Sequence, residues 1–334
     1  MVLWTIMKRE MVRLASRRIY LFMMVIAPVC CFLFFADLFK EGVPTNLPIA
    51  VVDKDNTSTS RSLTRSLDAF GQTEIVMRTG DFSEARKAMQ KGEIYGIFYI
   101  PENFRQEASS GKEPVLSFYT NDSYILPGSL IYKDMRLQAA LANGAVQKAL
   151  LEAKGDTDPR LSARLNPVVV DTHPLNNPWL SYAVYLSNIL LPAFLGMFAM
   201  FVVTYSFGEE LKKGTARELM ALSHDSVLTA VTGKLLPQLL IFMVIGCFCL
   251  ALLYRFLHFP LNSGFFPMFL AMLCLILASQ GFALLMTGIY SRNRIALSTC
   301  ALWSVLSFSV SGFTFPVRSM PEPMQYFVPL FPMR

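Results

Sequence analysis

Five long runs of uncharged, mostly apolar residues dominate the chain: 19–36, 179–208, 235–254, 256–291 and 295–317. An α-helix needs about 20 such residues to cross a bilayer, because the hydrocarbon core is about 30 Å thick. Charged residues make up only 16% of the 334 residues, against about a quarter in soluble domains. The sequence therefore predicts an α-helical polytopic membrane protein with five spans.

The predicted spans divide the chain into nine segments. A basic start before an apolar run is also typical of a signal peptide, but the first run contains Pro28 and has no small-x-small cleavage site near its end. We therefore expect an amphipathic helix at 1–18, spans at 19–39, 179–207, 229–254, 265–290 and 295–314, a polar domain at 40–178, a charged loop at 208–228 and a proline-rich segment at 315–334.

The first segment has apolar residues at helical spacing and a high density of basic residues. Trp4, Met7, Met11 and Leu14 follow the helical repeat, and five cations lie between Lys8 and Arg18. This pattern is typical of a helix lying in a membrane interface. The residues that we expect to contact the interface include Trp4, Lys8, Arg9 and Arg13.

The distribution of basic residues between the predicted spans indicates an orientation. With the N-terminus in the cytoplasm, eleven cations fall in inner segments and three in short outer ones. The inner set is Lys8, Arg9, Arg13, Arg17, Arg18, Lys212, Lys213, Arg217, Lys234, Arg292 and Arg294; the outer set is Arg255, Arg318 and Arg334. Because cytoplasmic loops are enriched in Lys and Arg, the polar domain at 40–178 is predicted to be extracytoplasmic.

The polar domain has the pattern of an α/β fold. Short apolar runs at 48–52, 74–77, 94–101 and 115–120 predict four strands, and helical periodicity covers 61–70, the residues between Asp81 and Gly92, and 127–154. Strands alternating with helices favour a small mixed sheet with helical cover. We interpret Asp53 and Asp55, which follow the first strand, as turn and helix-cap acceptors.

The sequence contains no motif that indicates catalysis. In the charged loop, EELKKGTAREL, the lysines precede Gly214, whereas a Walker A loop has its lysine after the second glycine. The three histidines lie in three different segments, and the six cysteines all lie in apolar runs without metal-ligand spacing. No basic patch with interleaved aromatic residues indicates nucleic acid. We therefore predict that the chain is not an enzyme and holds neither a metal nor a cofactor.

Four blocks, in order along nearly the whole chain, resemble the permease subunit of a type-2 ABC exporter with a large extracytoplasmic domain. They are PIAVVDKDNTSTSRSLTRSL, AMQKGEIYGIFYIPENFRQEASSGKEP, GEELKKGTARELMALS and SGFTFPVRSMPEPMQYF. In the third block Glu210, Gly214 and Thr215 match the family's inner loop, whereas Lys212 stands where a second acid is common. The last block is similar to an outer re-entrant segment that precedes a sixth helix, so we expect apolar sequence beyond Arg334.

The resemblance implies a function and partners. The inner loop would contact a separate ATPase subunit, which binds the ATP, through Glu209, Glu210, Gly214, Thr215 and Glu218. Further partners would be a second permease copy or a sister permease, and a periplasmic adaptor with an outer-membrane channel. The cargo would be a lipophilic or amphiphilic small molecule, exported across the inner membrane. The alternative is a membrane-anchored binding or receptor protein whose outer α/β domain is the functional part.

Overall fold

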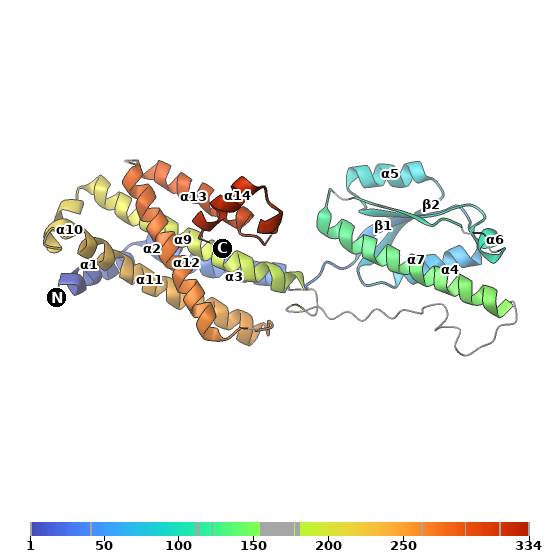
Figure 1. The fold of residues 1–334 in the computed structure, drawn as a ribbon, viewed down its shortest axis with the longest axis horizontal. Coiled ribbons are helices and arrows are strands. Elements are labelled where there is room, and N and C mark those ends of the chain that lie inside the picture. Colours follow the sequence, from blue (N-terminus) through green and yellow to red (C-terminus); the bar gives the residue numbers. More distant parts are fainter. Residues whose placement is uncertain are drawn as a thin grey trace. The chain divides into compact units, whose positions relative to one another are not determined.

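The computed structural model describes residues 2–40, 42–110, 112, 114–121, 123–153, 177, 181–261, 263–290, 292–313 and 315–332. The chain divides into two compact units. Met1–Gly42 and Pro174–Arg334 form the first, which we call the helical unit. Val43–His173 form the second, which we call the sheet unit (Figure 1).

The sheet unit is built on four strands in the order β2-β1-β3-β4. The strands are β1 (Leu47–Asp53), β2 (Thr73–Thr79), β3 (Gly96–Ile100) and β4 (Ser117–Thr120). β1 pairs in parallel with both β2 and β3, and β4 is antiparallel to β3. The central strand, LPIAVVD, is apolar on both faces, as expected for a strand covered by helices on each side.

Helices cover both faces of this sheet. Ile49 and Val51 pack with α4 (Ser58–Asp68), α6 (Phe104–Ser109) and α7 (Ile125–Ala153) on one face. Ala50 and Val52 pack with α5 (Phe82–Lys91) on the other (Figure 1). The four strands and the three longer helices confirm the sequence prediction, and α6 was not predicted. Thr57 and Ser60 form a capping box on α4, which explains its start.

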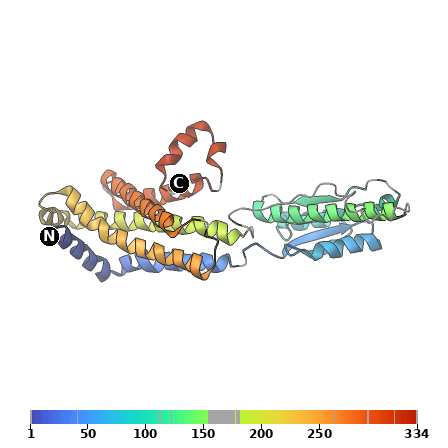
Figure 2. The same cartoon turned by 60° about the horizontal axis from the view of Figure 1, so that its bottom comes forward.

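The helical unit contains three long helices that run side by side: α9 (Tyr182–Lys213), α11 (Val227–Ala251) and α12 (Phe265–Ile289) (Figures 1 and 2). The N-terminal part consists of α1 (Val2–Ser16), α2 (Arg18–Leu21), η1 (Phe22–Ile26) and α3 (Ala27–Leu38). The remaining elements are α10 (Ala216–Leu222), η2 (Leu252–Phe256), α13 (Asn293–Val310), η3 (Val317–Ser319), α14 (Glu322–Phe327) and η4 (Val328–Leu330).

In the described part of the chain, four helical stretches are long and apolar enough to cross a membrane. They are Arg18–Leu38, Tyr182–Lys213, Val227–Phe256 and Phe265–Ile289, and they correspond to the first four predicted spans. α13 forms at the fifth predicted position but is not among the four, so the fifth span stays a prediction. Trp179, where the second span was predicted to begin, lies outside the described residues.

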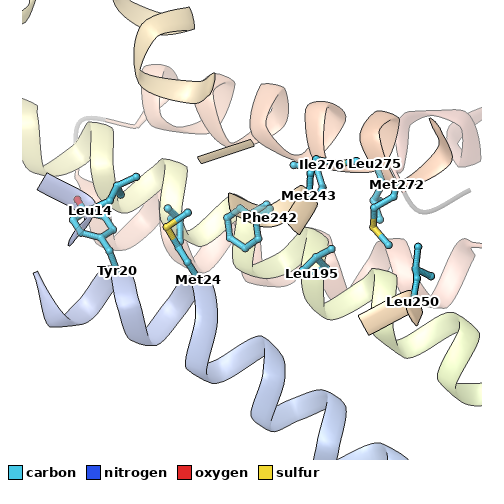
Figure 3. Close-up of a cluster of buried hydrophobic side chains, with 12 residues drawn as sticks. Leu14, Tyr20, Met24, Leu195, Phe242, Met243, Leu250, Met272, Leu275 and Ile276 are labelled. Atoms are coloured by element: carbon cyan, nitrogen blue, oxygen red, sulfur yellow. The ribbon is translucent and has the colours of Figure 1, made fainter. Parts of the chain in front are cut away.

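The core of the helical unit is a row of large apolar side chains between the helices. Figure 3 shows the row running from Leu14 and Tyr20 through Met24, Phe242 and Leu195 to Leu250. Small residues allow the helices to approach closely: a Cβ added at Gly196 would lie 3.1 Å from Ser279 Oγ. Small residues at helix contacts are a common device in membranes, because backbones then pack with little intervening space.

The sheet unit contains one buried carboxyl that generates a pH prediction. Asp134 on α7 is 6% exposed, and its Oδ2 has no hydrogen-bond partner among the described residues. Burial raises the pKa of the Asp134 carboxyl above its ordinary value, against the opposing effects of Lys133 and the Gln72 backbone. The destabilisation caused by burying the charged carboxylate is therefore fully present above the raised pKa of Asp134. It disappears as the pH falls below the pKa that the same carboxyl has in the unfolded chain.

We expect Asp134→Asn to stabilise the sheet unit at neutral pH by about 1 kcal/mol, because the amide carries no buried charge. Hydrogen exchange of α7 in the purified full chain would measure this, with stronger protection in the variant at pH 7 and a difference from wild type that shrinks as the pH falls toward the ordinary pKa of an aspartate. Glu93→Gln, which neutralises an exposed carboxylate, is the matched control. Equal protection in wild type and Asp134→Asn at pH 7 would contradict the prediction.

Candidate functional site

Three buried charges meet at the end of the helical unit where α1 packs against α11. Lys234 is 0% exposed, and Glu10 and Glu210 are each 1% exposed. The Lys234 Nζ lies 3.1 Å from Glu10 Oε2 and 3.0 Å from Glu210 Oε1. An unpaired buried charge is very costly, so the Lys234 ammonium group can be buried at this position only because the two carboxylates pair with it.

Arginines of α1 surround the same carboxylates. Arg9 donates to both oxygens of Glu210, at 3.1 Å and 3.3 Å, which is the bidentate geometry that guanidinium favours. Arg13 bridges Glu210 and Glu209, with Nη2 2.9 Å from Glu209 Oε2. Two further cations hold Glu209: Arg17, and Lys213 at 2.7 Å. We call Glu10, Glu209, Glu210, Lys234 and these four partners the charged network.

The spacing along α1 explains why one helix supplies so many partners. Arg9 and Arg13 are four residues apart, so they project from neighbouring turns of α1 toward the end of α9, and Arg17 lies in extended conformation between α1 and α2. Glu10 follows Arg9 and lies on the face of α1 that is buried with Ile6 and Leu14. Close packing brings this face onto α11, since a Cβ at Gly233 would lie 2.8 Å from Ile6 Cγ2.

Uncharged partners satisfy the remaining oxygens. Glu10 Oε1 accepts hydrogen bonds from Ser206 Oγ at 2.8 Å and from Gln238 Nε2 at 3.1 Å. The hydroxyl of Thr215 donates to Glu210. The charged network thus joins α1, the end of α9, the residue before α10 and the start of α11, so these elements are held in one arrangement.

The predicted coupling residues fall into a buried and an exposed group. Gly214 ends α9 in the left-handed conformation, at φ 73°, as expected for a helix-terminating glycine. Thr215 lies at the N-cap of α10 but makes no side-chain cap, because its hydroxyl is bound to Glu210. Glu218 on α10 is exposed, whereas Glu209 is 9% exposed.

Glu210 is enclosed by its own chain. The resemblance implied that it contributes to the contact with a separate ATPase subunit. In the structure Glu210 is buried and accepts from Arg9, Arg13, Lys234 and Thr215 of its own chain. The coupling role of Glu209, Glu210, Gly214, Thr215 and Glu218 stays a prediction, with the two glutamates acting through internal contacts.

The predicted interface helix also presents two faces. Trp4 is 69% exposed and Lys8 is exposed, so both are available to a bilayer surface. Arg9 and Arg13 are instead directed at Glu210. Glu10 and Lys234 were not predicted as site residues, although each carries a signal: Glu10 is the one acid of the basic helix, and Lys234 is the one charge between Asp225 and Arg255. A lone charge in an apolar helix is usually paired and functional.

A family model described as "ABC-2 family transporter protein" matches residues 18–334. The chain belongs to this family. It is similar to the "Probable multidrug ABC transporter permease YbhR" of Escherichia coli (strain K12), with 22% identity over 335 residues, 99% of this chain and 86% of the relative. The protein of the same name from Escherichia coli O157:H7 matches with the same values.

Membership in the ABC-2 family identifies the chain as a multi-pass membrane subunit of an ABC transporter, as the sequence resemblance indicated. The matched region begins at Arg18 and therefore includes Glu209, Glu210 and Lys234 of the charged network but not α1. In this ABC-2 protein α1, which lies outside the matched region, supplies Glu10, Arg9 and Arg13, and these contact Glu209, Glu210 and Lys234 inside it.

We expect Lys234→Met to destabilise this ABC-2 protein by about 3 kcal/mol, because Glu10 and Glu210 would remain buried without their shared cation. The thermal unfolding midpoint of the purified protein would measure the loss. Adding Glu10→Gln to Lys234→Met should recover part of it, since one of the two buried negative charges is then removed.

The matched control is Lys8→Met, which removes an exposed lysine from α1 and should leave the midpoint unchanged. The stabilising role of the charged network would be refuted if Lys234→Met unfolded at the same temperature as Lys8→Met.

Proposed function

We propose that the chain is the permease subunit of an ABC exporter, which moves a lipophilic or amphiphilic small molecule outward with ATP hydrolysed by a separate subunit. The observation that carries this proposal is the charged network, which binds the loop after α9 rigidly to helices long enough to span a bilayer. A loop held in this way can pass a displacement to those helices as a rigid body. The name of the Escherichia coli relative, a probable multidrug ABC transporter permease, supports the same function.

The exposed face of α10 is the surface that we propose for ATPase docking. Arg217 and Glu218 are exposed on it, and Leu222 is 40% exposed although it is apolar. Leu219 on the opposite face is buried against Ile6 and Ala230. A short helix that is anchored on one face and mixed in charge and apolar character on the other suits contact with a soluble subunit.

An apolar cavity within the helical unit supports a lipophilic cargo. It measures about 260 Å³ and is lined by residues of α9, α11, η2 and α12, including Leu191, Met272 and Leu275. Its polar lining includes Asn188, whose Oδ1 accepts a hydrogen bond from Tyr254 Oη at 2.8 Å. Mostly apolar walls with a few placed polar groups are typical of small-molecule sites.

We further propose an inner-membrane location with the N-terminus and the charged network in the cytoplasm and the sheet unit outside. The excess of Lys and Arg in the segments assigned to the cytoplasm supports this orientation. A second permease copy or a sister permease, and an adaptor with an outer-membrane channel, are proposed partners that follow from the resemblance to exporters.

The orientation predicts the labelling of two single cysteines introduced at exposed positions, Ser110→Cys and His224→Cys, in a chain whose own cysteines have been replaced. In cells with a permeabilised outer membrane, an impermeant maleimide should label Ser110→Cys and leave His224→Cys unlabelled until the inner membrane is opened. Labelling of His224→Cys alone before that step would overturn the orientation.

The docking surface predicts that Glu218→Lys lowers the amount of ATPase subunit co-purified with the permease by about tenfold, the effect of losing and reversing one interface charge. The thermal midpoint of the permease should not change, because Glu218 is exposed and lies outside the charged network. Co-elution with the ATPase and cargo-stimulated hydrolysis are the measurements.

Lys212→Glu is the matched control, since Lys212 is also exposed, lies in the same loop and would become the acid that is common in the family. It should bind and couple like wild type. Normal co-elution and hydrolysis in Glu218→Lys would exclude α10 as the docking surface.

A further inference from the structure

A second concave site lies in the sheet unit, at the ends of two neighbouring parallel strands. The connection from β1 enters α4 on one face of the sheet, and the connection from β2 enters α5 on the other (Figure 1). The two connections therefore separate and leave a crevice of about 490 Å³ between the carboxyl ends of β1 and β2. Ligand sites of open α/β sheets lie outside the carboxyl ends of the strands, as this crevice does.

Three arginines line the crevice. Arg61 and Arg65 are one helical turn apart on α4, and Arg78 lies near the end of β2. Arg61 donates to the Asn56 carbonyl at 2.9 Å, and Arg78 lies 3.6 Å from Asp68, which is itself exposed. Arg65 forms no ion pair with another described residue. All three side chains are exposed, so their guanidinium groups are available to a ligand.

The single acid among the lining residues is already committed to the fold. Asp53 accepts a hydrogen bond from Ser60 Oγ at 2.6 Å and from the backbone amides of Asp55 and Asn56 at 3.0 Å and 2.9 Å. These contacts hold its carboxylate in the turn that precedes α4. With three arginines and one aspartate, the lining carries an excess of positive charge.

We propose that this crevice binds the phosphate group of a phosphorylated small molecule or of a phospholipid headgroup. A carboxylate carries one charge and is satisfied by one guanidinium, whereas a phosphate monoester carries a charge of about −1.5 to −2 and offers three oxygens to several donors. The arginines on α4 and β2 supply several planar donors of the kind that suits an anion with three oxygens. The proposal stands apart from export, because its residues all belong to the sheet unit.

The test is calorimetric titration of the purified full chain with glycerol 3-phosphate. We expect saturable binding, weakened about tenfold by Arg65→Gln and by Arg78→Gln, the effect of losing one charge-assisted pair. Arg86→Gln is the matched control, because Arg86 is an exposed arginine of the same unit on α5, outside the crevice. It should bind like wild type, and acetate should bind at least tenfold more weakly than glycerol 3-phosphate.

Three results would overturn the site: no binding heat at millimolar ligand, equal weakening by Arg86→Gln, or equal affinity for acetate.

Repeating the titration in nanodiscs separates the two sources of phosphate. Weaker apparent binding of glycerol 3-phosphate in discs containing phosphatidic acid than in discs of neutral lipid supports a headgroup that competes for the crevice. Equal binding in both supports a soluble phosphorylated compound.

Discussion

The ammonium group of Lys234 lies between the carboxylates of Glu10 and Glu210, completely shielded from solvent, and the arrangement of the helical unit depends on that contact. Each of the three groups would be prohibitively costly to bury alone, so α1, α9 and α11 must come together for any of them to be accommodated. The surrounding arginines, Ser206, Gln238 and Thr215 then complete the hydrogen bonding. Because this contact joins three helices, a displacement of one of them would disturb the contacts of the other two.

The two units are stabilised by different kinds of interaction. The sheet unit follows the rules of soluble α/β domains, with a strand apolar on both faces and helices that begin at capping residues. The helical unit exposes many large apolar side chains, such as Phe266 and Val244, which suits helices surrounded by lipid. Specific packing there comes from small residues and paired charges, because apolar burial alone does not distinguish a neighbouring helix from a lipid tail.

The family assignment and the geometry support different conclusions about this protein. Membership in the ABC-2 family identifies a membrane subunit of an ABC transporter. Geometry distinguishes the roles within the charged loop, because Glu210 is enclosed by its own chain whereas Glu218 faces outward. This difference supports the proposed division of the loop, in which Glu210 acts through contacts within the chain and the exposed Glu218 contacts the ATPase subunit.

The sequence by itself determined the polytopic helical class, the α/β nature of residues 43–153 and most strand and helix positions, because these follow from local periodicity, capping residues and run length. It also placed Gly214 in a charged loop between two predicted spans. Only the tertiary structure decided that Glu10 and Lys234, 224 positions apart, share one site, and that Arg61 and Arg78 line one crevice. Those pairings depend on which helix faces and strand ends meet in space, and a pattern of neighbours along the chain does not record that.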